Sequence, residues 1–178
     1  MSSIASRSLK FVFLAVSLSA CSPTLNWRET RIDDTGLIVL FPCRPDRLTR
    51  SVAVAGKTID MHLTACDAGG ASFAVSHAEF AEGRAAQQGL AEWRKATLAN
   101  MAADAVAESP IGIQQAAAPD GRTLVTPVKA VGKQVDGSVV TLNGVWFVRA
   151  NRVFHAAIYA PKVTAEMSDT FFSGLGFQ

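Results

Sequence analysis

The chain has 178 residues, of which 17 are lysine or arginine and 15 are aspartate or glutamate. Two of the basic residues, Arg7 and Lys10, lie in an N-terminal segment without acidic residues, so the rest of the chain carries 15 of each sign. This balance excludes nucleic-acid binding through bulk positive charge. The length suits one domain with a sizeable hydrophobic core.

The first element in chain order is a short apolar run. Residues 11–20 carry no charge and follow Arg7 and Lys10, and small residues close the run before Cys21. The run is about half as long as the roughly 20 residues that a bilayer-spanning helix needs. A basic start, an apolar middle and a small-residue end are typical of a secretory signal peptide, which we expect over residues 1–20.

The residues Leu18-Ser19-Ala20-Cys21 resemble the lipobox of bacterial lipoprotein signal peptides. The resemblance implies cleavage before Cys21 and lipidation of its thiolate, which is a good nucleophile. Two or more acyl chains hold a protein firmly on a membrane. By the same resemblance, Ser22 in place of an aspartate implies an address at the outer membrane, facing the periplasm. The alternative is a conventional secretory signal, with Cys21 at this position by chance.

Two further cysteines, Cys43 and Cys66, remain once Cys21 is assigned to the lipid. Because the bacterial periplasm is oxidising, we expect a disulfide between them. The alternatives are two buried thiols, or a redox or metal site. The long spacing is unlike the C-x-x-C of thioredoxin-type chemistry.

We expect the lipidated cysteine and a tether over residues 21–34, which leads into an initial strand or turn, and a single globular domain over residues 35–178. Runs of apolar or alternating residues between turn signals predict strands. These strands cover residues 37–41, 48–55, 58–65, 71–80, 111–117, 122–131, 138–149 and 153–159. Apolar residues at every third or fourth position predict a long helix over residues 83–108 and a short one around residues 163–171. This order indicates an α+β fold with an antiparallel sheet flanked by helices.

Several segments resemble the PsbP-like fold, as found in small bacterial envelope domains of unknown function. They are LIVLFP from Leu37, GGASFAV ending at Val75, VWFV and NRVF between residues 145 and 154, and FFSGL from Phe171. The resemblance implies an α/β/α sandwich with one long central helix and a short C-terminal helix. It also implies a role in binding partners, although fold by itself does not give function.

The segment from Ser51 to Thr58 mimics the phosphate-binding motif G-x-x-x-x-G-K-T. A serine stands in place of the first glycine, and the pattern continues as a strand through Ile59, where the motif requires a helix. We therefore interpret this segment as a hairpin turn.

His62 and His77 lie on strands that we expect to be neighbours, and such side chains can ligate zinc or copper. The hydrophobic pattern favours pairing Ala65 with Phe73, which puts the two histidines on opposite faces of the sheet. A slip of one residue would bring His62, His77 and Asp60 together. On the favoured pairing we expect no metal site, and no motif suggests a cofactor.

Support for catalysis is weak. The sequence has no G-x-S-x-G, and Ser76 and His77 are strand neighbours that point to opposite faces. Glu79 and Glu82 lie near a strand end and are interpreted as solvated. No catalytic residue is therefore predicted.

The first hairpin carries a basic stretch, which is either a solvated face or a patch for anionic lipid headgroups or an acidic partner. Its residues are Arg44, Arg47, Arg50 and Lys57. Together these features lead us to expect a non-enzymatic, lipid-anchored envelope protein that binds a protein partner. The alternative is a periplasmic carrier or sensor that holds a small apolar ligand between sheet and helix. An enzyme is the third hypothesis.

Overall fold

The computed structural model describes residues 24–54, 56–107 and 125–178. The signal segment, the lipidation site Cys21 and the strand predicted at residues 111–117 lie outside the described residues. The described strands form a seven-stranded sheet in the order β3-β4-β5-β9-β8-β7-β6 and a three-stranded sheet in the order β1-β2-β10. Every pairing in both sheets is antiparallel.

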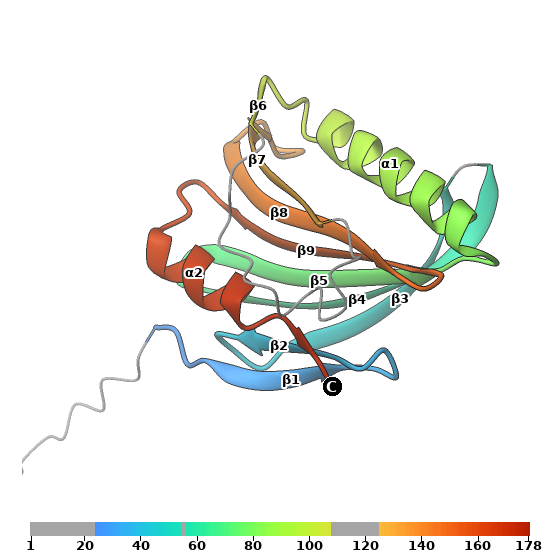
Figure 1. Cartoon of the computed structure of the whole chain (residues 1–178). Helices are drawn as coiled ribbons and strands as arrows, with labels where there is room; N and C mark the ends of the chain where they lie inside the picture. The colour runs from blue at the N-terminus through green and yellow to red at the C-terminus, as the bar shows by residue number, and fades with distance from the viewer. Residues whose placement is uncertain (1–23, 55, 108–124) are drawn as a thin grey trace, which may run out of the picture.

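The large sheet contains β3 (Asp46–Val54), β4 (Lys57–Ala68), β5 (Ala71–Glu79), β6 (Ala105–Ala107), β7 (Val125–Lys133), β8 (Val139–Arg149) and β9 (Arg152–Ala160). The small sheet contains β1 (Arg28–Ile32), β2 (Leu37–Phe41) and β10 (Gly176–Phe177). Helix α1 (Gly83–Asn100) covers one face of the large sheet, while α2 (Ala165–Ser173) and the small sheet lie over the other face (Figure 1). Both faces of the large sheet are therefore covered.

The predicted α/β/α sandwich with a long central helix is wrong. The described part of the chain is mostly strand and has two helices, and a second sheet lies where the sandwich would have part of a helical layer. Residues 28–32, assigned above to the tether, pair with β2 along its whole length. The described residues therefore do not form the architecture implied by the PsbP-like resemblance, although most of the predicted strands are present.

Helix α1 also ends earlier than predicted. Its last residue is Asn100, and Ala102 takes a left-handed conformation with φ of +44°, which an α-helix cannot continue through. Residues 105–107, which continue the helical period in the sequence, instead form β6 against β7. Tertiary pairing therefore overrides the helical pattern at this point.

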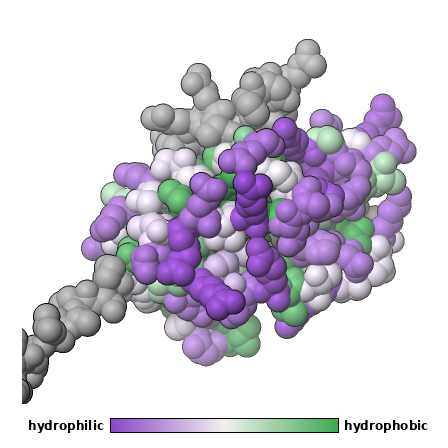
Figure 2. Space-filling model, turned by 90° about the horizontal axis from the view of Figure 1, so that it is seen from below, coloured by the Kyte–Doolittle hydropathy of each residue, from purple (hydrophilic) through white to green (hydrophobic). Residues whose placement is uncertain are grey.

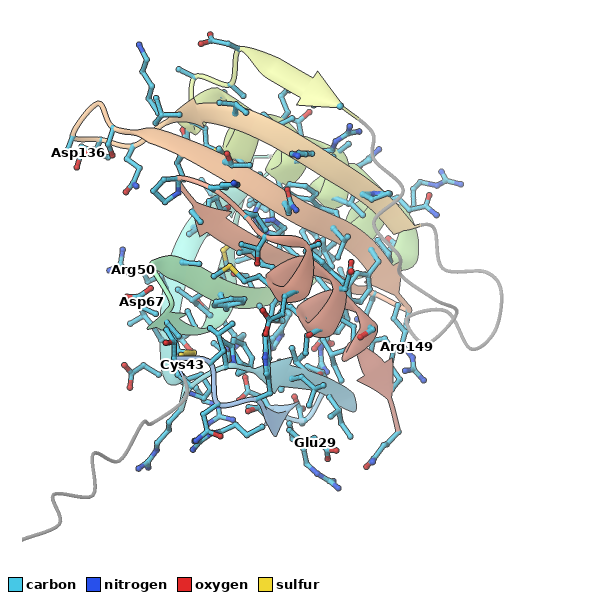
Figure 3. The ribbon with its side chains drawn as sticks, turned by 90° about the vertical axis from the view of Figure 1, so that its left-hand side faces the viewer. Glu29, Cys43, Arg50, Asp67, Asp136 and Arg149 are labelled. Carbon is cyan, nitrogen blue, oxygen red and sulfur yellow. A yellow bond between two sulfur atoms is a disulfide. The ribbon has the colours of Figure 1, made fainter. Side chains whose placement is uncertain are left out.

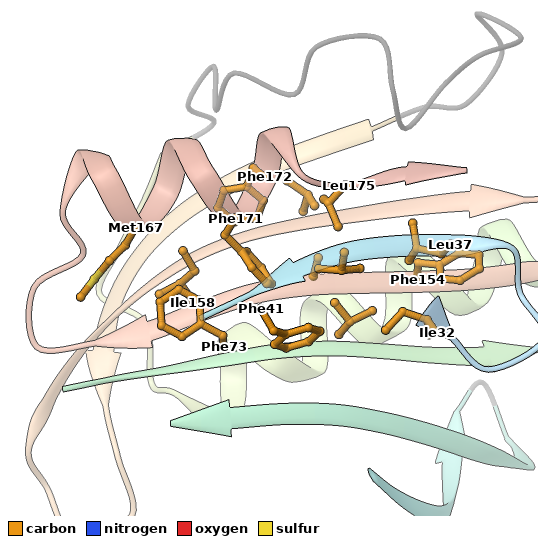
Figure 4. Packing of buried hydrophobic residues seen from close by; sticks show 14 of the residues in the cluster. Ile32, Leu37, Phe41, Phe73, Phe154, Ile158, Met167, Phe171, Phe172 and Leu175 are labelled. Atoms are coloured by element: carbon orange, nitrogen blue, oxygen red, sulfur yellow. The ribbon is translucent and has the colours of Figure 1, made fainter. Parts of the chain in front are cut away.

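The main core lies between the large sheet, the small sheet and α2 (Figure 4). Phe171 of α2 is fully buried, and its ring lies 5.7 Å from that of Phe41 and 5.5 Å from that of Phe73. Trp27 packs edge-on against Phe73 with ring centroids 5.6 Å apart, so the residues before β1 are part of the folded domain. This aromatic contact joins the N-terminal segment to the middle of the large sheet.

The β4–β5 hairpin has a two-residue loop made of Gly69 and Gly70, with φ of +60° and +73°. Positive φ at both loop residues is the requirement of a type I′ turn, which suits the twist of antiparallel strands. The loop fixes Ala68 opposite Ala71 and thereby sets the register of the whole hairpin. This register brings His62 opposite His77.

Cys43 and Cys66 form a disulfide with Cα atoms 6.1 Å apart, the pair that the cysteine count predicts. The bond joins the segment before β3 to β4, near one edge of the large sheet where Figure 3 labels Cys43. Within the described residues, neither helix is long and apolar enough to cross a membrane.

Candidate functional site

A cavity of about 610 Å³ lies at the end of the interface between the two sheets. Strands β3, β4, β5 and β9 of the large sheet contribute to it, together with the turn between β1 and β2. Ionisable side chains dominate its lining; they are Asp33, Asp34, Arg47, Asp60, His62, His77, Glu79 and Arg152. This is the candidate site, because polar groups from distant segments converge in it.

Two histidines form the floor of this cavity. His62 of β4 and His77 of β5 are paired directly across the hairpin, so both side chains project from the same face. Their rings stack with centroids 4.7 Å apart and planes 12° apart. The face on which they lie is the one that the small sheet covers.

Asp33 reaches the histidines from the β1–β2 turn, where it has a φ of +42°. Its Oδ2 atom lies 3.1 Å from Nε2 of His77, and its Oδ1 atom lies 3.4 Å from Nε of Arg47. The carboxylate is thus held on both sides, by an imidazole and by a guanidinium group.

His77 is 4% exposed, and burial lowers its pKa despite the opposing effect of the hydrogen bond to Asp33. The neutral form of the imidazole is therefore favoured at neutral pH. Its Nδ1 atom is buried and has no hydrogen-bond partner among the described residues. A leucine of similar volume would avoid that unpaired polar atom, so the ring is not explained by stability alone.

His62 is half-buried and is oriented by Thr49 of the neighbouring strand β3. The Thr49 hydroxyl lies 3.0 Å from Nδ1 of His62. The Nε2 atom of His62 is then left for another contact. Thr49, His62 and His77 thus form a row across three adjacent strands, with Asp33 next to its end.

The charged residues around the histidines form a second group at the mouth of the cavity. Arg152 of β9 donates to Glu79 Oε2 over 2.9 Å and lies 3.5 Å from Asp34. Arg152 and Asn151 lower the pKa of Glu79 through hydrogen bonds. Asp60 accepts a hydrogen bond of 2.7 Å from Ser51.

Such a site holds the elements of cation binding better than those of nucleophilic catalysis. The Thr49 hydroxyl contacts His62, but the Asp33 carboxylate orients His77. The described side chains at this site therefore do not form the series of hydrogen bonds that links a nucleophile to a base and the base to a group that orients it.

The observed register of β4 and β5 differs from the one on which the expectation of no metal site was based. The predicted pairing of Ala65 with Phe73 is wrong, because Cys66 lies opposite Phe73. Ile59 and Met61 pack with the α1 side of the sheet, and His62 projects to the other side with His77. The observed register is thus the one-residue slip, in which His62 and His77 share a face of the sheet.

The basic stretch does not lie on one face. Arg47 and Arg50 are three residues apart on β3, so they project from opposite faces of the sheet. Arg47 pairs with Asp33, whereas Arg50 lies at the edge labelled in Figure 3. Arg44 precedes β3, and Lys57 begins β4.

The phosphate-motif mimic is a hairpin, as interpreted from the sequence. Val54 of β3 pairs with Lys57 of β4, and Gly56 has a φ of +73°. The segment enters a strand and offers no helix N-terminus to a phosphate. Ser76 pairs with His155 on the α1 side, away from His77.

Asp33 is the site residue that sequence reasoning missed. In the sequence it belongs to a turn cluster, and 44 positions separate it from His77. Only the packing of the small sheet on the large one brings it to the histidines. No local pattern carries this information.

A second cavity, of about 810 Å³, lies at the opposite end of β5, next to Ala71 and Ser72. The end of α1, the β4–β5 turn, the β7–β8 hairpin and the end of β9 surround it. Its apolar lining includes Met101, Val140 and Pro161. Tyr159 also lines it, and burial raises the pKa of this phenol to about 12.

Comparisons of this chain with protein-family models, with curated proteins and with solved structures give no significant match.

Proposed function

We propose that the chain is a lipid-anchored envelope protein, held at the outer membrane and facing the periplasm, whose domain binds a protein partner. The observation that carries this proposal is Cys21 directly after Leu18-Ser19-Ala20. The disulfide between Cys43 and Cys66 supports it, because disulfides persist in an oxidising compartment and are rare in the cytosol.

A surface for the partner is provided by the β7–β8 hairpin. Val131 and Val139 are exposed on one face of this hairpin, and Val135 is fully exposed at its turn. Asp136, next to Val135, marks the hairpin end that projects from the body in Figure 3. Exposed apolar side chains gathered at one place favour protein contact. The face in Figure 2, by contrast, is mainly hydrophilic with scattered apolar residues.

The second candidate is a carrier or sensor of a small apolar ligand. The observation that favours it is the cavity of about 810 Å³ between the end of α1 and the sheet. This volume lies within the range of roughly 300–1,000 Å³ that is common for small-molecule sites. Val135 lies at the turn of the exposed hairpin and also lines this cavity. The proposed partner surface and the proposed ligand cavity therefore lie next to each other.

The anchor is tested by fractionating bacteria that produce the full chain. We expect the protein in the outer-membrane fraction. Replacement Cys21→Ala should abolish acylation, and Ser22→Asp should shift the acylated protein to the inner membrane. Membrane attachment through lipid in the Cys21→Ala variant would contradict the proposal.

The partner is tested with a photoreactive amino acid at Val139 in intact envelopes. Position Thr58, an exposed β-branched residue on the β3–β4 hairpin, is the matched control. A discrete cross-linked protein with the Val139 probe, absent with the Thr58 probe, supports partner binding. A bound small apolar molecule in native mass spectrometry of the full chain, without a protein cross-link, would favour the carrier.

A further inference from the structure

Three potential metal-ligating side chains meet in the cavity between the sheets. One donor atom from each of Asp33, His62 and His77 can be chosen so that all three lie within 4.8 Å of one another. The residues come from the β1–β2 turn, β4 and β5, so the folded structure alone brings them together. We propose that Asp33, His62 and His77 bind a divalent ion of the late transition metals, such as Zn²⁺ or Cu²⁺. This inference does not depend on the proposed function.

The Asp33–His77 pair has nearly the separation that a metal needs. In a tetrahedral zinc site, donors at the usual bond lengths are about 3.3 Å apart. Oδ2 of Asp33 lies 3.1 Å from Nε2 of His77. An ion can therefore replace the hydrogen atom of this contact with little movement of either side chain.

His62 supplies the third ligand by a small rotation. Its ring is now stacked almost parallel to that of His77, and an ion cannot lie in the planes of both rings in that arrangement. A ring nitrogen of His62 lies within 4.8 Å of the donor atoms of Asp33 and His77, so His62 must leave the stack to reach the tetrahedral spacing of about 3.3 Å. The half-buried position of His62 at the cavity allows this rotation.

Both flexible ligands already have partners that orient them. Thr49 contacts Nδ1 of His62, which leaves Nε2 as the donor atom. Arg47 contacts Oδ1 of Asp33, which leaves Oδ2 toward His77. Contacts of this kind, to the atom that does not bind the metal, are characteristic of protein metal sites.

The charge of the cavity also favours a dication. Four carboxylates and two guanidinium groups line it, which leaves a formal charge of −2 when both histidines are neutral. Because two of the three ligands are imidazoles, the site should select Zn²⁺ and Cu²⁺ over Ca²⁺ and Mg²⁺, which prefer oxygen.

The test is calorimetric titration of the full chain in detergent, with its disulfide intact, using Zn²⁺ and then Cu²⁺. We expect one ion per chain, tighter binding of Cu²⁺ than of Zn²⁺, and no binding of Mg²⁺. The electron paramagnetic resonance spectrum of the Cu²⁺ form should show coupling to two imidazole nitrogens.

Substitutions of the proposed ligands test whether the ion binds at this site. His62→Ala and Asp33→Asn should each weaken binding by more than about 100-fold, because even outer partners of ligands contribute about 10- to 100-fold. Thr49→Val should keep one ion per chain with about tenfold weaker binding. His155→Phe, which removes the histidine on the opposite face, is the matched control and should bind normally.

Circular dichroism of each variant ensures that a loss of binding is not a loss of folding. A folded wild-type chain that binds neither ion would overturn the proposal. Unchanged affinity in both the His62→Ala and the Asp33→Asn variants would overturn it equally.

Discussion

His62 lies directly opposite His77 on adjacent antiparallel strands, and their imidazole rings stack with centroids 4.7 Å apart. The pair faces the small sheet, whose β1–β2 turn brings Asp33 to within 3.1 Å of His77. Polar groups are thus concentrated at one end of an interface that is otherwise filled with aromatic and aliphatic side chains.

The disulfide is expected to contribute a large share of the stability. Cys43 and Cys66 are 23 positions apart, and closing a loop of that length stabilises a fold by about 3 kcal/mol in the chain-entropy account. The double variant Cys43→Ser/Cys66→Ser should lose about that free energy of unfolding in guanidinium titrations. The wild type with a reductant is the control and should lose a similar amount. A loss below about 0.5 kcal/mol in both would contradict the prediction.

The stability should fall in mild acid because of His155. Burial lowers the pKa of His155 to about 3, so between that pH and 6.5 the unfolded chain binds a proton that the folded chain does not. The contribution is fully present above pH 6.5 and is lost as the pH falls toward 3. From pH 7 to pH 5 this loss amounts to about 2 kcal/mol.

The variant His155→Phe isolates this effect. The phenyl ring can keep the stacking on Trp146, which is now 4.0 Å from the imidazole. We expect the free energy of unfolding, measured in guanidinium, to fall between pH 7 and pH 5 by about 2 kcal/mol less in the variant than in the wild type. His77 remains in both proteins, so its own titration cancels in the comparison. An equal drop in wild type and variant would show that His155 is not the group responsible.

Gly132 is required by a close approach between β7 and the residue that follows α1. A Cβ atom at this position would lie 2.3 Å from the backbone oxygen of Met101, which also accepts a hydrogen bond from the Lys133 amide. Gly132→Ala should therefore reduce the free energy of unfolding by about 1–3 kcal/mol. Gly176→Ala, at a strand position with no atom within 4 Å of the new Cβ, is the control. Similar stability of the two variants would contradict the argument.

Phe171 joins α2 to both sheets and is expected to be among the most sensitive core positions. Its ring contacts those of Phe41, Phe73 and Phe172. Phe171→Ala should reduce the free energy of unfolding by about 3–5 kcal/mol, while Phe171→Leu should lose less. Chemical denaturation of both variants checks the order. The prediction fails if the alanine variant loses no more than the leucine variant.

Most strands could be predicted from the sequence because apolar runs and turn residues are local signals. Residues 37–41 are the clearest case, and the observed β2 has the same bounds. Strand β1 was expected only as an initial strand or turn without bounds, because its residues Arg28–Ile32 are mostly polar and exposed. Their pairing with β2 makes the second sheet, which the sequence does not indicate.

The register of the β4–β5 hairpin could have been predicted by a different signal. The hydrophobic pattern is a poor guide here, because both faces of the large sheet are covered and both carry apolar residues. The adjacent Gly69 and Gly70 favour a two-residue loop, which places His62 opposite His77. Turn chemistry, rather than hydrophobicity, determines the register of this hairpin.

The position of Asp33 could not be predicted from the sequence. A turn residue at a strand end carries no local sign of the sheet against which it will pack. Its contact with His77 depends on the packing of β1 and β2 over the face that carries the histidines. Such contacts between distant segments require the three-dimensional structure.

The state of Cys21 can be measured from the intact mass of the protein extracted from bacterial membranes. We expect a chain that begins at Cys21, carries the added mass of its acyl chains and lacks two hydrogens because of the Cys43–Cys66 bond. A chain that begins elsewhere, or that begins at Cys21 without acyl groups, would show that the protein is not anchored through lipid on Cys21.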